Sequence, residues 1–317
     1  MSRNNPKVSV CVVTYNQEKY IRKCLQSIVD QETDFDFDVI VGDDFSADGT
    51  RTIVQEFAKK YPAQVNIILH NKNVGACENY RAVHRMASGK YIAHVDGDDW
   101  VYPGKLLKQV QYFDSNENCA LVAHRMSIWV GARQVGTTRK NPPHITLSEL
   151  LLGHPMFLNS STMYRRGEIG DYFPSVADFI DFYIYVKAAM KGDIGFINEV
   201  LGGYLRNVGV SSKRDLMPYI QASIDLAIGF VPSKVVNVAR AKRYRAYATA
   251  ALMAGDNAQF EENINAARQF DKSSFVIYGL FCLKQHVKLI KMFIYWYKSL
   301  REQSFRLNKL FFWGRYD

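Results

Sequence analysis

The first hundred residues of this 317-residue chain alternate between short apolar runs and segments whose apolar side chains recur at helical spacing. Apolar runs rich in β-branched residues predict strands, and the helical spacing predicts helices between them. The predicted strands are residues 8–13, 38–42, 65–69 and 91–95. Such alternation favours an α/β fold, with a doubly wound, mostly parallel sheet whose crossover connections are right-handed.

Three of the predicted strands run directly into polar loops. These loops are residues 14–16, 43–48 and 96–99. The carboxyl ends of parallel strands meet at one edge of a sheet, and open α/β sheets bind their ligands there. We therefore expect the three loops to lie together and to form the functional site.

The third loop is the most acidic, with the sequence Asp96-Gly97-Asp98-Asp99. Three carboxylates in four residues repel one another unless a cation or several hydrogen-bond donors neutralise them. Oxygen ligands suit hard divalent ions such as Mg²⁺ and Mn²⁺, which commonly also hold substrate phosphates. The alternative is an Asp-Gly turn in a solvated loop, and this motif alone does not decide between the two.

Four stretches, taken in order, resemble the family 2 glycosyltransferases, which have the GT-A nucleotide-sugar fold. They are residues 8–16, 41–50, 73–79 and 88–100. The resemblance covers about residues 7–115 and continues more weakly to about 212. It implies an inverting transfer of a sugar from a nucleotide diphosphate donor, with a UDP-sugar as the first expectation and Mn²⁺ or Mg²⁺ as the cofactor.

The resemblance also implies roles for individual residues. The donor-binding positions would be Thr14, Tyr15, Asn16, Asp43, Asp44, Asn73, Gly75, Asn79, Asp96 and Arg206. Asp98 and Asp96 would hold the metal, and Asp99 would lie near the sugar or the ion. Asp181 would be the general base, with Asp178 as the second candidate. The alternative for both aspartates is an acidic residue that merely favours a helix N-terminus.

The chemistry explains why such a site needs these groups. The leaving diphosphate gains negative charge as the glycosidic bond breaks, and a divalent ion stabilises that charge. The acceptor hydroxyl loses a proton, and a positioned carboxylate that takes it contributes roughly 10²–10⁴ in rate. Because a single displacement inverts the configuration, no enzyme nucleophile is required.

Two departures from the family pattern concern the diphosphate contacts. Many relatives have an arginine directly before the position of Asn79, where this chain has Glu78. Many also have a Tyr-Arg-x-His pattern where this chain reads Tyr204-Leu205-Arg206-Asn207. Asn207 thus replaces the usual histidine and Arg206 is shifted by one place, so it is open which of the two substitutes for that histidine.

Composition limits the compartment and the partners. The formal net charge is +9, and the five cysteines have no metal-ligand spacing, which suits a reducing compartment. Neither a signal peptide nor a membrane span is evident, so we expect a cytoplasmic protein at or near the inner face of the membrane. No nucleic-acid-binding signature is present, and nucleic acid is not an expected partner.

The pattern changes to long helices after about residue 216, so we predict a catalytic domain at 1–212 and a helical, basic extension at 213–317. The expected acceptor is a glycan or a lipid-linked glycan, in the biosynthesis of a surface polysaccharide. Two alternatives remain at this point. One is a sugar nucleotidyltransferase, and the other is a catalytically silent subunit that binds a sugar nucleotide or a glycan.

Residues 275–317 carry eight basic and two acidic side chains, which gives 8 − 2 = +6. A basic face beside an aromatic one suits a helix in a membrane interface, where each basic residue contributes about 1 kcal/mol. The alternative is a basic solvated face on a helix that packs against the domain.

Flotation with anionic liposomes separates these interpretations. We expect the full chain to float with the vesicles and a truncation at residue 274 to float much less, because the truncation removes the basic and aromatic segment. Equal flotation of the two proteins would refute membrane docking by this segment.

Overall fold

The computed structural model describes residues 5–153, 157–166, 178–206 and 215–271. The chain divides into two compact units, Met1–Val236 and Asn237–Asp317. The basic segment 275–317 and Asn207 lie outside the described residues. The proposed domain boundary at 212/213 therefore stays a prediction.

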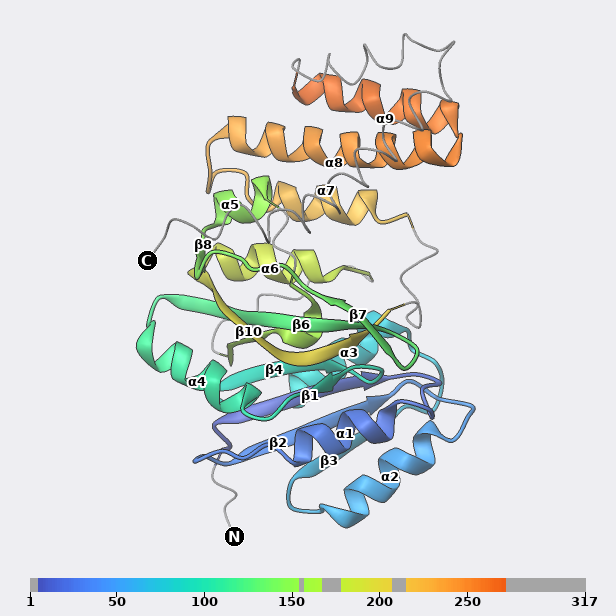
Figure 1. The fold of residues 1–317 in the computed structure, drawn as a ribbon, viewed down its shortest axis with the longest axis vertical. Helices are drawn as coiled ribbons and strands as arrows, with labels where there is room; N and C mark the ends of the chain where they lie inside the picture. Colours follow the sequence, from blue (N-terminus) through green and yellow to red (C-terminus); the bar gives the residue numbers. More distant parts are fainter. Residues whose placement is uncertain (1–4, 154–156, 167–177, 207–214, 272–317) are drawn as a thin grey trace. The chain divides into compact units, whose positions relative to one another are not determined.

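Within the described residues, ten strands of the first unit form one sheet, with the order β3-β2-β1-β4-β9-β6-β10-β5 (Figure 1). β7 pairs with β6, and β8 pairs with β10. The strands are β1 (Val8–Thr14), β2 (Phe37–Asp43), β3 (Val65–Leu69), β4 (Tyr91–Asp96), β5 (Trp100–Val101), β6 (Cys119–Val130), β7 (Arg133–Thr137), β8 (His144–Ile145), β9 (Met163–Arg165) and β10 (Asp193–Leu205).

The N-terminal half of the sheet is parallel, as predicted. β1 pairs in parallel with both β2 and β4, and β2 pairs in parallel with β3. Beyond β4 the sheet is mixed, because the short strand β9 runs antiparallel to both β4 and β6. The sequence did not predict β9, since three residues are too few to show a period.

Helices cover both faces of the parallel half, which is the predicted doubly wound arrangement. α1 (Ile21–Val29), α2 (Thr50–Lys60) and α4 (Lys105–Ser115) share one hydrophobic core with alternate residues of β1, β2 and β4. α3 (Ala76–Met86) packs on the opposite face, where the Cys11 thiol donates to the backbone oxygen of Val83.

The remaining helices of the first unit lie toward the second half of the sheet. α6 (Asp181–Ala189) packs against β6 and β10, and it also contacts α5 (Leu147–Leu152) and α7 (Met217–Asp225). The apolar pattern of residues 179–190 predicts a helix, and the structure confirms this helix and shortens it at both ends.

The register of the parallel strands brings the predicted loops together. Thr14 pairs with Asp43 across β1 and β2, and Val13 pairs with Asp96 across β1 and β4. Backbone hydrogen bonds continue past the strand ends, from Asp44 N to Thr14 O and from Gly97 N to Val13 O. The three polar loops therefore lie along one edge of the sheet, as the sequence indicated.

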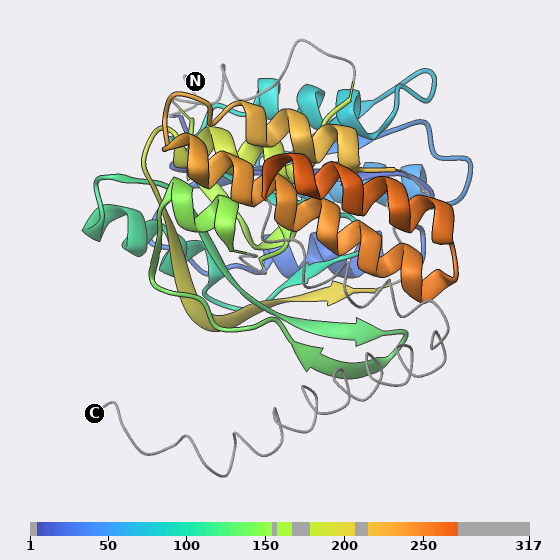
Figure 2. The same ribbon diagram turned by 90° about the horizontal axis from the view of Figure 1, so that it is seen from above.

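The described part of the second unit is a helical hairpin of α9 (Asn257–Phe270) and the part of α8 (Ser233–Ala254) from Asn237 onward, seen side by side in Figure 2. Gly255 adopts a φ of +82° at the turn, and the Asp256 side chain caps α9 by accepting from Gln259 N. In the described part of the chain, no helix is both long and apolar enough to cross a membrane.

The close approach of α3 to β2 leaves no room for a side chain at Gly42. An added Cβ there would overlap Asn79 Oδ1 and Val83 Cγ1. We expect Gly42→Ala to lower the free energy of unfolding by about 1–3 kcal/mol, because overpacking displaces well-packed neighbours. Gly136→Ala is the matched control, since a Cβ on that strand residue meets nothing within 4 Å. Chemical denaturation measures both, and equal effects would contradict this account.

Candidate active site

The acidic cluster turns sharply at the end of β4. Asp99 N donates to Asp96 O across the turn, and the crowding of Gly97 by Thr14 and Gln17 leaves no room for a larger residue. Asp98 is 8% exposed and Asp99 only 2%. The Asp96 side chain is 39% exposed, so it is the most accessible of the three carboxylates.

Ser160 connects this cluster to the second half of the sheet. It lies in the 3₁₀ helix η1 (Asn159–Ser161), and its hydroxyl donates to Asp99 Oδ2 at 2.5 Å. The same hydroxyl oxygen accepts from Asp96 N at 3.0 Å. Leu205 N, at the end of β10, donates to the other oxygen of Asp99 at 3.0 Å. Both oxygens of Asp99 are thus engaged, and the carboxylate braces β4 against η1 and β10.

The negative charges of the three carboxylates are only partly compensated, and this shifts their pKa values. Desolvation, followed by repulsion from Asp96, raises the pKa of Asp98 to about 6. Desolvation and the charges of Asp96 and Asp98 also raise the pKa of Asp99 well above its usual value. Desolvation acts on Asp96 as well, but hydrogen bonds from His94 and Ser160 hold its pKa below the ordinary value.

The donor set fits a hard divalent ion that is shared with a substrate. Among the described residues, no group of three or more His, Cys, Asp or Glu side chains is arranged to hold a metal. Asp96 and Asp98 supply two carboxylates, and Mg²⁺ sites commonly combine one or two carboxylates with substrate phosphates and water. The raised pKa of Asp98 fits this reading, because a cation would offset the repulsion between the two charges.

Asp181 belongs to the same constellation. It is the first residue of α6, and desolvation followed by repulsion from Asp96 raises its pKa to about 6. The residue is accessible to solvent, although the protein around it desolvates the carboxylate. Because Asp96 and His94 both act on the pKa of Asp181, the fold brings this residue near the end of β4 from a position 85 residues away in the sequence.

The loop after β1 is fastened to the loop after β2. Asn16 N donates to Ser46 Oγ at 2.9 Å, and Asn16 Oδ1 accepts from Ala47 N at 2.8 Å. Thr14 is buried and donates to Gln17 Oε1 at 2.8 Å. Tyr15 is 43% exposed at the same edge. Thr14 therefore shapes the edge from the interior, Asn16 fastens the two loops although it is exposed, and Tyr15 presents its side chain to solvent.

The structure separates the roles of the two aspartates that follow β2. The Asp44 carboxylate accepts from Val74 N at 2.6 Å and from Gly75 N at 3.0 Å, and so it holds the loop before α3. Asp43 Oδ2 accepts from Arg51 Nε at 2.8 Å. Among the described residues no group donates to Asp43 Oδ1, although this atom is buried. Asp43 therefore keeps a buried oxygen whose capacity to accept a hydrogen bond is unused among the described residues.

Asn73, Gly75 and Asn79 lie next to this loop. Gly75 has a φ of +88°, and Asn73 Nδ2 reaches Asp44 O at 3.4 Å. Asn79 is buried, donates to Gly42 O at 2.9 Å, and its Oδ1 lies 3.2 Å from His70 Nε2. This pairing of both ends of the Asn79 amide is typical of a residue that fastens α3 to β2.

The structure shows the surroundings of Glu78 and Arg206, which belong to the two departures from the family pattern. Glu78 forms ion pairs with Arg81 and Arg85, at 3.1 Å each, on its own helix. Arg206 is exposed, and its backbone N donates to Trp129 O. Since its neighbour Leu205 is bonded to Asp99, Arg206 lies beside the acidic cluster.

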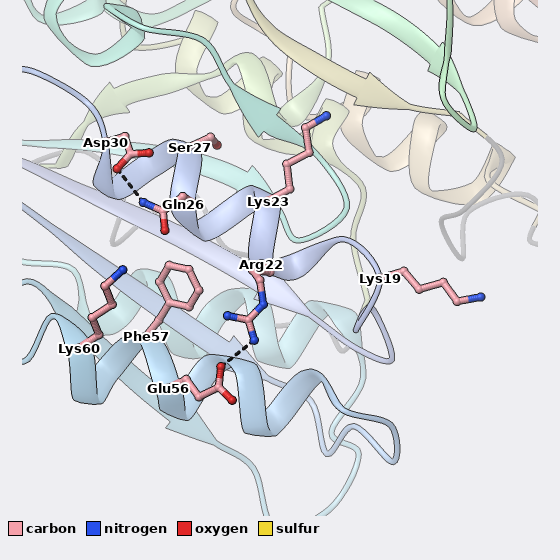
Figure 3. A pocket seen from close by; sticks show the side chains of 9 residues that line it. All are labelled: Lys19, Arg22, Lys23, Gln26, Ser27, Asp30, Glu56, Phe57 and Lys60. Carbon is pink, nitrogen blue, oxygen red and sulfur yellow. Dashed lines mark hydrogen bonds and ion pairs between the residues drawn. The ribbon is translucent and has the colours of Figure 1, made fainter.

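A basic groove between α1 and α2 is distinct from this site. Figure 3 shows Lys19, Arg22, Lys23 and Lys60 around it, with Arg22 paired to Glu56. None of the residues that line the groove is a predicted site residue. Sequence reasoning therefore located the strand ends as the candidate site but gave no signal for this groove.

Comparison with known proteins identifies the family. The model of glycosyl transferase family 2 matches residues 9–173. The chain belongs to glycosyl transferase family 2. The resemblance seen in the sequence is thereby confirmed.

Curated relatives of this chain include bacterial proteins. TuaG of Bacillus subtilis, named as a teichuronic acid biosynthesis glycosyltransferase, is 32% identical over 68% of this chain and 85% of its own. An uncharacterized protein of Mycobacterium tuberculosis is 34% identical over 63% of this chain. The match to that protein spans 59% of its length.

Solved structures show the same fold. S. aureus TarS residues 1–349, in complex with UDP-GlcNAc, matches with a TM-score of 0.65 at 21% identity, over 83% of this chain and 80% of that one. The mannosyltransferase PcManGT from Pyrobaculum calidifontis, in complex with GDP-Man and Mn²⁺, matches with a TM-score of 0.54 at 16% identity, over 92% and 84%. These likenesses confirm the GT-A-like fold with C-terminal helices.

The raised pKa of Asp98 gives a pH-dependent prediction for the metal-free protein. Between pH 4 and 6 the folded state holds a proton that the unfolded state has released, so wild-type stability falls as the pH rises through this range. Asparagine at position 98 does not titrate, so Asp98→Asn lacks this pH-dependent loss. Its free energy of unfolding relative to wild type should therefore rise by up to about 3 kcal/mol between pH 4 and pH 7.

Urea unfolding in EDTA at each pH measures the difference. Asp114→Asn is the control of opposite sign, because hydrogen bonds from Lys7 and Tyr91 outweigh desolvation and hold the pKa of Asp114 below its usual value. Asp114→Asn should lose stability relative to wild type as the pH rises. If the Asp98→Asn difference does not depend on pH, Asp98 is not a strained carboxylate.

Proposed function

We propose that this protein is a metal-dependent, inverting glycosyltransferase that moves a sugar from a nucleotide diphosphate donor to a glycan or a lipid-linked acceptor. The observation that carries the proposal is the convergence of Asp96, Asp98 and Asp181 at one edge of the sheet, with raised pKa values at Asp98 and Asp181. Two carboxylates suited to a cation and a third suited to proton transfer are the groups that this chemistry requires.

The nucleoside would bind at the ends of β1 and β2. The buried Asp43 Oδ1 can accept a hydrogen bond from a base N–H, and the Arg51 guanidinium lies next to it on Oδ2. Tyr15 and Phe45 are 43% and 48% exposed at this edge, which is unusual for large aromatic side chains. Two accessible aromatic rings beside a buried acceptor support a site for a planar base.

The diphosphate and its cation would lie at the end of β4. Asp96 and Asp98 would hold Mn²⁺ or Mg²⁺, which when bound neutralises charge that develops on the leaving diphosphate. Asp99 would act indirectly, because Ser160 and Leu205 already occupy both of its oxygens. Arg206 would contribute its positive charge from the end of β10, next to the residue that Asp99 binds.

Asp181 would take the proton from the acceptor hydroxyl. A general base is most effective when its pKa lies near the working pH, and desolvation together with Asp96 raises the pKa of Asp181 to about 6. Its accessibility to solvent is also what an incoming acceptor requires. A base on a separate helix from the metal carboxylates can stand on the opposite side of the sugar, as inversion demands.

The comparisons support a choice of donor and process. TarS in its complex binds UDP-GlcNAc, so a UDP-sugar is the first donor to test. Mn²⁺ accompanies GDP-Man in PcManGT, which supports the cofactor. TuaG is named for teichuronic acid biosynthesis, which supports surface polysaccharide assembly at the cytoplasmic face of the membrane as the process.

The proposed base can be tested by separating donor binding from transfer. Asp181→Asn should leave Mn²⁺-dependent binding of the donor nearly intact and lower the transfer rate by about 10²–10⁴, because the amide cannot accept the proton. Asp98→Ala should instead abolish the Mn²⁺-dependent gain in thermal stability on donor addition. UDP-sugars are screened first by thermal shift, and transfer is then measured as released UDP.

Three outcomes would contradict the proposal. Full transfer by Asp181→Asn would reject it as the base. Unchanged Mn²⁺-dependent donor binding by Asp98→Ala would reject the metal assignment. If wild-type protein neither hydrolyses nor transfers any donor that it binds in Mn²⁺, the silent binding subunit would be the better description. Asp114→Asn serves as a control, since this exposed carboxylate pairs with Lys7 away from the strand ends.

A further inference from the structure

A line of buried polar side chains leads from Asp96 into the interior of the first unit. His94 Nε2 lies 3.0 Å from Asp96 Oδ1, and His94 Nδ1 lies 3.1 Å from His84 Nε2. His84 Nδ1 in turn is hydrogen-bonded to the Tyr164 hydroxyl. His94, His84 and Tyr164 are each at most 3% exposed. They come from β4, α3 and β9, so three elements of the fold meet in one line.

When His94 is neutral, hydrogen-bond chemistry gives this line a single direction. An ionised carboxylate only accepts, so His94 must carry its proton on Nε2. In a neutral ring Nδ1 is then an acceptor, and it must receive a proton from His84 Nε2. His84 Nδ1 is consequently an acceptor as well, and the Tyr164 hydroxyl donates to it. Each donor thus fixes the tautomer of the next ring, and the last proton points at Asp96.

The packing keeps the two imidazoles in place. The Tyr80 ring stacks on His84 with centroids 4.0 Å apart and lies 4.5 Å from His94. Burial, with a smaller contribution from His94, lowers the pKa of His84 well below its usual value, so this ring is neutral at physiological pH. The two stacked imidazoles cannot easily rotate, because each nitrogen would lose its partner in a buried setting.

We infer that Tyr164, His84 and His94 form a one-way hydrogen-bond relay that positions the Asp96 carboxylate for its cation and the donor diphosphate. The inference rests on the proposed function, because it takes Asp96 as a metal ligand. Asp96 is the most accessible carboxylate of the cluster and would otherwise be free to change rotamer. The bond from His94 holds Oδ1, and Oδ2 lies 3.3 Å from Ser160 Oγ, whose single proton goes to the shorter contact with Asp99, so Oδ2 keeps a lone pair for the ligand.

Partners behind a metal ligand orient it, and their loss typically weakens metal binding by about 10- to 100-fold. In this chain His94, which orients Asp96, is itself oriented by His84 and Tyr164. All three are therefore positioning residues and do not touch the substrate. Their sequence positions, 84, 94 and 164, carry no shared motif, so nothing in the sequence marks them as a group.

The tautomers of the wild-type protein provide the first test, which needs neither metal nor donor. In metal-free protein with ¹⁵N-labelled histidine, long-range ¹H–¹⁵N correlation spectra should show His94 and His84 both protonated on Nε2. Protonation of either ring on Nδ1 would overturn the relay, because the chain of donors would then point away from Asp96.

A matched pair of variants at His84 provides the second test. Methionine and glutamine have similar volumes, but only the glutamine amide can donate to His94 Nδ1. His84→Met should weaken Mn²⁺ binding about tenfold, at the low end of the range for such partners, whereas His84→Gln should keep it within about threefold. Electron paramagnetic resonance measures free Mn²⁺ directly, without any transfer reaction. Equal affinities of the two variants would overturn the inference.

Tyrosine hydroxyls test the far end of the relay. Tyr164→Phe should weaken Mn²⁺ binding by about threefold, since it removes only the outermost donor. Tyr91→Phe is the control, because this buried tyrosine lies on the same strand as His94 but donates to Asp114. A loss of Mn²⁺ affinity in Tyr91→Phe as large as in Tyr164→Phe would overturn a specific role for Tyr164.

These results can be told apart from a failure of the proposed function. If the wild-type protein binds no Mn²⁺, the metal assignment fails and the tautomers alone decide whether the relay exists. If Mn²⁺ binds and responds to the His84 pair but no sugar is transferred, the relay stands and the transferase activity fails.

Discussion

Repulsion among the carboxylates at the end of β4 is the constraint on which the site depends. A strand that ends in three aspartates within four residues requires donors or cations around it. The fold supplies donors from three directions: His94 on β4 itself, Ser160 on η1 and the backbone of Leu205 on β10. Asp98 receives less of this support, and its pKa remains raised. A cation bound at this edge would offset the part of the repulsion that these donors leave unmet.

The sequence predicted the parts of the molecule that depend on local patterns. The four N-terminal strands, their parallel pairing and the meeting of their polar ends follow from apolar runs and crossover rules, and the structure confirms them. The family resemblance added Asp181, which spacing alone could not have brought to Asp96. Ser160 and the His84–Tyr164 contact were missed, because each joins residues more than 60 positions apart without any periodic signal.

Residue type indicated the site but did not distinguish ligand-binding roles from structural ones. Asp43 and Asp44 are adjacent and chemically identical, yet Asp44 holds the loop before α3 while Asp43 keeps one buried oxygen without a donor among the described residues. Asn79 likewise uses both ends of its side-chain amide in hydrogen bonds with Gly42 and His70. These differences come from tertiary hydrogen bonds, which a single sequence does not encode in a local form.

The hydrogen bond from Leu205 N to Asp99 has a consequence for how the molecule can be divided. The family model ends at residue 173, whereas this bond reaches the last residue of β10. A fragment cut at the family boundary would leave a buried carboxylate oxygen without its donor, at a cost of about 1–3 kcal/mol or more. The minimal autonomous folding unit is therefore longer than the segment by which the family is recognised.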